Sequence, residues 1–146
     1  MSDPKNAHYK ELLVRMNAAY SAQYYLEAIW YAYSILEDRC VSALRQSGGE
    51  RYANGQPIKT LGKKLSILKE RRPNDPLLKA YFSDALMDRL KKWKDERDGL
   101  MHAMADAVIP LSEVDKKKFI IAEQASGLVR DTCAAARRLK ANRNKA

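Results

Sequence analysis

The fold is decided by a long helix-forming segment with an arginine on its buried face: Trp93-Lys94-Asp95-Glu96-Arg97-Asp98-Gly99-Leu100-Met101-His102-Ala103-Met104-Ala105-Asp106. Apolar residues recur every three or four positions along this region, at Leu86, Leu90, Trp93, Leu100, Met104 and Ala107. This spacing predicts a helix that buries one face. Position 97 belongs to the same series, and a guanidinium that faces a core requires a partner or a function.

The rest of the chain carries the same helical periodicity. Only six Gly and five Pro occur among 146 residues, and alternating strand patterns are absent. We expect helices over residues 4–47, with or without a bend near Ser21, and over 60–72, 76–110 and 112–139, with an irregular loop at 48–57. Helix starts are predicted at Asp3-Pro4, Thr60 and Asp75-Pro76. The sequence therefore predicts a single all-α domain over residues 1–146, a bundle of about four or five mostly antiparallel helices with a basic tail at 137–146.

The chain is strongly basic, with a formal net charge of +9 at pH 7. A basic surface favours an acidic partner, and nucleic acid is the commonest one. The alternative is a soluble protein that is basic without such a partner.

Residues 18–36 form a nearly uncharged segment, in which Glu27 is the single charged residue. Ser21, Gln23 and five tyrosines make it too polar to span a membrane. We interpret it as a helix buried at the bundle centre or at a subunit interface, rather than as a base-stacking platform. The two cysteines, Cys40 and Cys133, lie in helical patterns and are expected to be buried thiols in a reducing cytoplasm.

Asp98, His102 and Asp106 are spaced four residues apart and so fall on one helical face. We expect Asp98 to accept a hydrogen bond from His102 and to orient its imidazole. Arg97 and His102 are separated by about 140° around the helix axis, so one chain cannot bring both onto one substrate atom. Two facing copies of the helix in a twofold dimer could do so. Histidine can move the proton of an RNA 2′-hydroxyl and arginine can hold the phosphate, so no metal is required.

The segment Arg97-Asp98-Gly99-Leu100-Met101-His102 resembles the Arg-(four to six residues)-His motif of the HEPN superfamily of prokaryotic toxin and defence RNases. Tyr33-Ser34-Ile35-Leu36-Glu37-Asp38-Arg39 is similar to the acidic early helix of those proteins. The resemblance implies a homodimer with a composite active site and metal-independent endoribonuclease activity. It also implies a role in toxin–antitoxin or antiphage systems, with an antitoxin protein as a partner. The catalytic candidates are Arg97, Asp98 and His102, no cofactor or metal is expected, and the lysines beside the motif are candidate RNA-binding residues: Lys91, Lys92 and Lys94.

Several alternatives stay open at this point. His102 could be a core histidine satisfied by Asp98 or by a carbonyl, and Arg97 could form a buried ion pair with Glu37 or Asp38. The chain could be a non-catalytic module of the same fold that binds RNA or a nucleotidyltransferase partner. It could also be a metal-binding bundle that uses the row of Asp98, His102 and Asp106, although three ligands from consecutive turns of one helix converge poorly.

Overall fold

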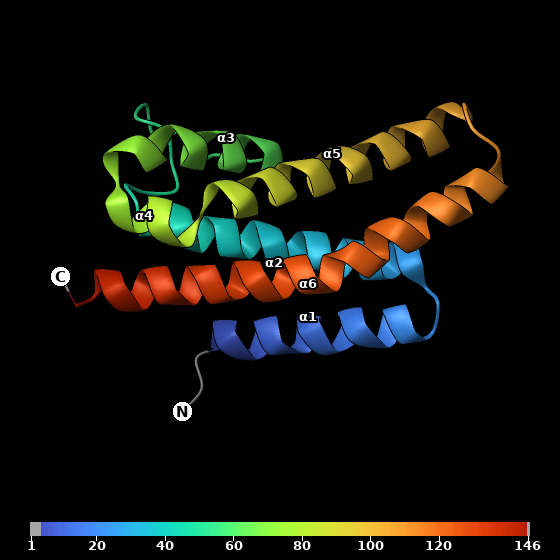
Figure 1. The fold of residues 1–146 in the computed structure, drawn as a ribbon, viewed down its shortest axis with the longest axis horizontal. Coiled ribbons are helices and arrows are strands. Elements are labelled where there is room, and N and C mark those ends of the chain that lie inside the picture. Colours follow the sequence, from blue (N-terminus) through green and yellow to red (C-terminus); the bar gives the residue numbers. More distant parts are fainter. Residues whose placement is uncertain (1–3, 146) are drawn as a thin grey trace. The chain divides into compact units, whose positions relative to one another are not determined.

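The computed structural model describes residues 4–145, and the side chains of Lys5 and Asn6 are not described. The helices are α1 (Pro4–Ser21), α2 (Tyr25–Arg45), α3 (Leu61–Arg71), the 3-10 helix η1 (Arg72–Asn74), α4 (Pro76–Tyr81), α5 (Asp84–Asp106) and α6 (Leu111–Arg143) (Figure 1). Over the described residues no strand forms, and β-type pairing is limited to one isolated bridge between Arg51 and Pro57. The all-α prediction is confirmed for this part of the chain. The predicted cap at Asp3 lies outside it.

The helix count differs from the predicted four or five because two expected helices are interrupted. The helix expected over 76–110 breaks after Tyr81, where Phe82 leaves the helical region with φ −95° and ψ 71°. The Ser83 hydroxyl then accepts a hydrogen bond from the Leu86 amide at 3.2 Å and starts α5. Between α1 and α2, Gln23 takes a φ of 65° and the Tyr24 amide bonds back to the Ala19 carbonyl at 2.8 Å. This left-handed residue closes α1 and reverses the chain.

The predicted helix starts at Thr60 and Asp75 are confirmed. The Thr60 hydroxyl accepts a hydrogen bond from the Lys63 amide at 3.1 Å, and the Asp75 carboxylate accepts one from the Leu78 amide at 3.1 Å. Each side chain satisfies an amide that the first helical turn leaves without a partner.

The chain divides into two compact units, Met1–Ile35 with Trp93–Gly127, and Leu36–Lys92 with Leu128–Ala146. In the first unit α1 and the start of α2 run antiparallel, and the end of α5 turns back into the start of α6 (Figure 1). Its buried apolar residues are Met16, Ala19, Ala28, Ile29, Ala32, Ile35, Trp93, Leu100, Val114, Ile121, Ala122 and Ala125.

Specific contacts link the helices of the first unit. The Trp93 indole is 2 % exposed, and its Nε1 donates a hydrogen bond to the Ile121 carbonyl of α6 at 2.9 Å. The rings of Tyr25 and Phe119 meet edge to face with centroids 5.2 Å apart, and Tyr25 makes a similar contact with Tyr20 at 5.7 Å. These aromatic contacts join the start of α2 to α1 and to α6.

In the second unit, ion pairs join elements that are far apart in sequence. Lys64 is 4 % exposed, and its ammonium donates to Glu37 of α2 at 3.0 Å and to the Lys59 carbonyl at 2.6 Å. Arg143, at the end of α6, places one guanidinium nitrogen 2.8 and 2.6 Å from the two oxygens of Asp75. The apolar core of this unit includes Leu36, Leu44, Leu61, Leu68, Leu78, Phe82, Leu90, Val129 and Leu139.

The predicted irregular loop is confirmed by its backbone. Gly48, Gly49 and Gly55 have positive φ values of 127°, 111° and 86°, a region that residues with a Cβ rarely enter. Arg71 of α3 holds the start of the loop by donating to the carbonyls of Leu44 and Gly49 at 3.2 and 2.8 Å.

Both cysteines are buried thiols, as predicted. Burial raises the pKa of Cys40 to about 12, so this thiol stays protonated at neutral pH. Among the described helices, none combines the length and the apolar character that crossing a bilayer demands.

Candidate functional site

The predicted apolar seam of α5 is real but shorter than expected. Leu90, Trp93 and Leu100 are buried, whereas Met104 is 37 % exposed and Ala107 is exposed. The seam therefore ends about one turn before the helix does. Arg97 lies inside the buried part of the series, as the spacing predicts.

Arg97 is held by an aromatic ring and a carboxylate. Its Cζ lies 4.2 Å from the centroid of the Tyr33 ring of α2, which is the geometry of a cation–π contact. Its Nη1 donates to Asp98 Oδ1 at 3.0 Å, and 24 % of its side chain is exposed. The guanidinium is thus fixed in place while part of it faces solvent.

The Arg97 side chain also has unused hydrogen-bonding capacity. Its Nε is buried and has no hydrogen-bond partner among the described residues. A buried donor without a partner costs free energy, which a ligand that accepts from it would recover. Glu37 binds Lys64 and Asp38 binds its neighbour Arg39 within the second unit, and the alternative of an ion pair between either acid and Arg97 stays a prediction.

Asp98 does not orient His102, so the predicted hydrogen bond between them is wrong for the described structure. The Asp98 carboxylate instead accepts from Lys94 at 3.0 Å, one turn earlier in α5, and from Arg97. Lys94 and His102 are equally spaced from Asp98, and the full charge of the ammonium makes the stronger pair. The hydrogen bond that Lys94 donates to Asp98 raises the pKa of Lys94, and a further contact with Asp95 acts in the same direction.

His102 is exposed on the surface of α5. Within residues 4–145 no hydrogen bond or ion pair engages its imidazole. The core-histidine alternative is therefore wrong. The row of Asp98, His102 and Asp106 does not form a metal site, since no group of three or more acidic, histidine or cysteine residues in the described chain could hold an ion.

The three candidate RNA-binding lysines differ in their surroundings. Lys94 belongs to the same unit as Arg97 and His102, is 25 % exposed and is paired with Asp98. Lys91 and Lys92 are exposed and belong to the second unit. Of the three candidate lysines, Lys94 is therefore the one that belongs to the same unit as Arg97 and His102.

Two residues important for this arrangement were not predicted as site residues. Tyr33 supports the Arg97 guanidinium, and Trp93 anchors the same helix to α6. The sequence does carry a signal for both, because each is an aromatic residue on the buried seam of its helix. Which aromatic ring meets which cation depends on how α2 and α5 pack.

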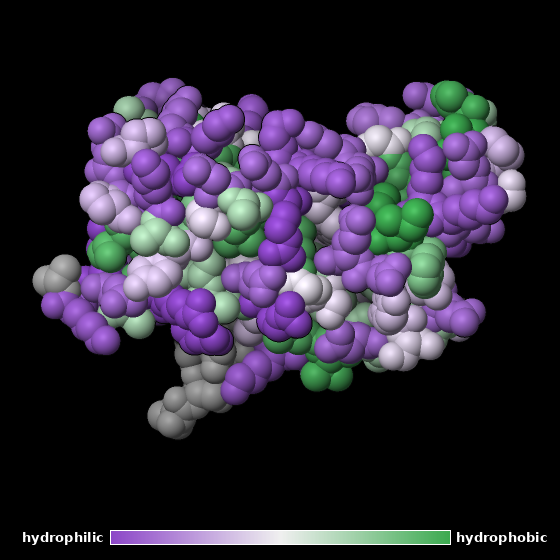
Figure 2. Space-filling model, in the orientation of Figure 1, coloured by the Kyte–Doolittle hydropathy of each residue, from purple (hydrophilic) through white to green (hydrophobic). Residues whose placement is uncertain are grey.

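An apolar surface surrounds the turn that follows His102. Hydrophobic side chains gather over the turn between α5 and α6 (Figure 2). Val108 and Leu111 are 72 % and 77 % exposed, and Phe119 and Ile120 of α6 are 39 % and 48 % exposed. Apolar surface of this kind, beside exposed polar residues, is typical of an interaction site.

No family model matches the chain, and no curated protein or solved structure is significantly similar to it.

Proposed function

We propose that this protein is a metal-independent endoribonuclease of the HEPN type, active as a homodimer with a composite site and serving as a toxin or antiphage defence component. One observation carries the proposal. Arg97, held over Tyr33 with a buried Nε that lacks a partner, lies on the same helix as His102, an exposed histidine with no partner among residues 4–145. A fixed guanidinium and a solvent-accessible imidazole are the two groups that cleavage of an RNA phosphodiester needs without a metal.

The proposed reaction is an internal transfer at phosphorus. The 2′-oxygen attacks the adjacent phosphorus, the bond from phosphorus to the 5′-oxygen breaks, and the products are a 2′,3′-cyclic phosphate and a 5′-hydroxyl. His102 takes the 2′-hydroxyl proton or supplies one to the leaving 5′-oxygen, and water carries out the other proton transfer. Arg97 binds the phosphate oxygens as their negative charge grows. Asp98 positions Arg97 and Lys94 in this scheme, in place of the role toward His102 expected from its spacing.

A second copy of the chain completes the proposed site. Arg97 and His102 point about 140° apart around one helix, so Arg97 of one copy would act with His102 of the other. The exposed apolar surface at the turn after α5, with Val108 and Leu111, supports contact between two copies at the His102 end of the helix. The exposed Tyr24 and Trp30 extend the candidate interface to the tyrosine-rich segment.

The test is cleavage of single-stranded RNA by the purified protein in excess EDTA. We expect cleavage by the wild type and a loss of at least about a hundredfold in His102→Ala, the scale of a lost general acid or base. His8→Ala is the matched control, because His8 is the other histidine and is exposed on α1. Full activity of His102→Ala would contradict the proposal. RNA binding without any cleavage by the wild type would favour a non-catalytic HEPN-like module that binds RNA or a nucleotidyltransferase.

A further inference from the structure

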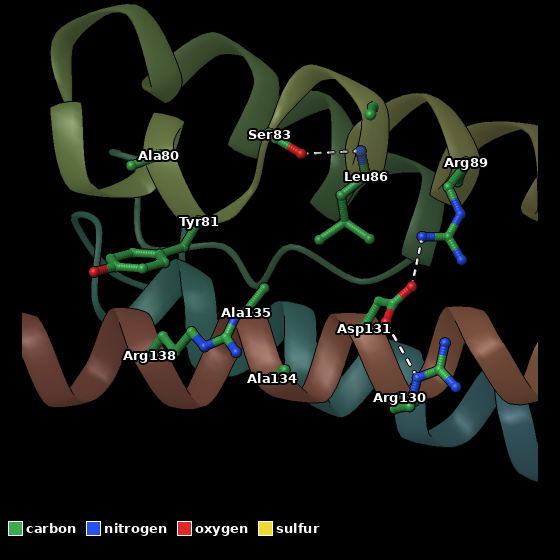
Figure 3. A pocket seen from close by; sticks show the side chains of 11 residues that line it. Ala80, Tyr81, Ser83, Leu86, Arg89, Arg130, Asp131, Ala134, Ala135 and Arg138 are labelled. Carbon is green, nitrogen blue, oxygen red and sulfur yellow. Dashed lines mark hydrogen bonds and ion pairs between the residues drawn. The ribbon is translucent and has the colours of Figure 1, made fainter.

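The second unit contains a surface pocket of about 460 Å³ that the proposed active site does not use. Its walls come from the end of α4, the start of α5 and the second half of α6, so three separate parts of the sequence build it (Figure 3). The volume falls in the range of small-ligand sites, about 300–1,000 Å³.

Small side chains keep this pocket open. Ala134 and Ala135 lie on its α6 side, and Ala80 lies at the end of α4 (Figure 3). Ala135 is 5 % exposed, so the floor is closed by the core, whereas Ala134 is half-buried and faces the hollow. A larger residue at position 134 would fill the space without breaking the core.

The pocket carries an excess of positive charge. Arg89, Arg130 and Arg138 line it together with one acid, Asp131, which leaves two net positive charges. Asp131 accepts from Arg89 at 2.8 Å and from Arg130 at 3.3 Å. The hydrogen bond from Arg89 and then that from Arg130 lower the pKa of Asp131, so it remains an anion at neutral pH and fixes both guanidinium groups.

One end of the pocket holds an arginine, Arg138, and an aromatic ring, Tyr81 (Figure 3). Arg138 makes no ion pair or side-chain hydrogen bond with another residue of the described chain. It lies toward the same end of the pocket as Tyr81, while the group formed by Arg89, Asp131 and Arg130 lies at the other end (Figure 3). A ligand that fits this arrangement has an anionic group for the arginines and a flat ring for Tyr81.

We propose that this pocket binds the 5′-phosphorylated terminal nucleotide of a single-stranded RNA, with its phosphate between Arg138 and the group of Arg89 and Arg130, and its base against Tyr81. The choice of RNA rests on the proposed function. The choice of a terminal phosphate rests on charge, because a phosphate monoester carries nearly two negative charges at neutral pH, whereas an internal phosphodiester carries one. Two net positive charges match the monoester.

The experiment measures binding of two five-nucleotide RNAs that differ only in a 5′-phosphate or a 5′-hydroxyl and carry a fluorophore at the 3′ end. The titrations use His102→Ala, so that the RNA stays intact, and binding is followed by fluorescence anisotropy. We expect the 5′-phosphorylated RNA to bind about tenfold more tightly, as one added charge-assisted contact allows. Competition by AMP but not by adenosine would show that the terminal nucleotide alone is enough. Competition only by phosphorylated oligonucleotides would show that the following nucleotides contribute, and either result supports the site.

Three variants locate the binding. Arg138→Gln removes the unpaired charge and Ala134→Leu fills the hollow without a change of charge, and we expect each to reduce the preference for the 5′-phosphate to less than about twofold. Arg137→Gln is the matched control, because Arg137 is the exposed neighbour on α6 and does not line the pocket. Equal affinity for the two RNAs, or a preference that survives both pocket variants, would overturn the proposal. Neither result depends on cleavage, so the pocket and the proposed active site can fail separately.

Discussion

Replacing Asp75 tests how the second unit fastens the end of α6. The Asp75 carboxylate accepts a hydrogen bond from the Leu78 amide at the start of α4 and binds Arg143 of α6 through both oxygens. Asp75→Ala removes both interactions, whereas Asp75→Asn keeps an oxygen for the Leu78 amide and loses the charge. The two variants therefore separate the helix cap from the ion pair.

The expected losses follow from these contacts. A helix cap contributes about 1 kcal/mol. The side chains of Asp75 and Arg143 are 15 % and 32 % exposed, and such a partly buried pair contributes about 1 kcal/mol. We therefore expect the free energy of unfolding to fall by about 2 kcal/mol in Asp75→Ala and by about 1 kcal/mol in Asp75→Asn.

The pH dependence gives a second check on the same residue. Burial alone would raise the pKa of Asp75, but the hydrogen bonds from Arg143 and from the amides of Leu78 and Leu77 together hold it below its usual value. A lowered pKa in the folded state contributes stability above the unfolded value of about 3.9, and this stability is lost as the pH falls through the folded pKa. The difference between wild type and Asp75→Asn should be constant from pH 7 to about pH 5 and shrink toward pH 3.

Urea unfolding followed by circular dichroism measures both effects. A double-mutant cycle of Asp75→Asn and Arg143→Gln should give a coupling free energy of about 1 kcal/mol at pH 7. A coupling free energy near zero, or equal losses in the alanine and asparagine variants, would refute the assignment of two separable interactions to Asp75.

Three further predictions concern the helices that carry the site and the buried thiol. Gly99→Ala should raise the free energy of unfolding by about 0.5–1 kcal/mol in thermal melts. Gly99 lies inside α5, and a Cβ at this position meets nothing within 4 Å. A loss of stability would contradict this prediction. Trp93→Phe should lower the free energy of unfolding by about 2 kcal/mol in urea titrations, because the variant loses the hydrogen bond to the Ile121 carbonyl and part of a buried ring. A loss under about 0.5 kcal/mol would contradict a stabilising role for this hydrogen bond. Cys40 should resist iodoacetamide at pH 8 in the folded protein and react after denaturation, because the thiol is buried and its pKa is raised to about 12. Peptide mass spectrometry measures the labelling, and rapid labelling of the folded protein would contradict the burial of this thiol.

Local rules of the sequence were sufficient for many features of the fold. The caps at Thr60 and Asp75 and the place of Arg97 on a buried seam all follow from residue type and helical spacing. The break at Phe82 was not predictable in this way, because the apolar series continues through it at Leu78, Phe82, Leu86 and Leu90, and only the hydrogen bond of Ser83 marks the new start.

The contacts of the candidate site were less predictable because they depend on competition and on tertiary packing. Asp98 has Lys94 four residues before it and His102 four residues after it, and spacing alone does not say which one it binds. The support of Arg97 by Tyr33 and the pocket with three arginines each join segments that are distant in the sequence. Helical periodicity places residues on a face but does not say which face of another helix they meet.

The central claim is that Arg97 of one chain acts with His102 of another. Its most direct test is RNA cleavage by a heterodimer, made by co-expressing Arg97→Ala and His102→Ala with two different affinity tags and purifying over both. In this heterodimer one of the two sites across the interface keeps both its arginine and its histidine, although neither chain has the complete pair. We expect each homodimeric variant to be inactive and the heterodimer to recover about half of the wild-type cleavage rate, as one intact site of two requires. An inactive heterodimer, or a wild-type protein that cleaves RNA as a monomer, would contradict the composite site.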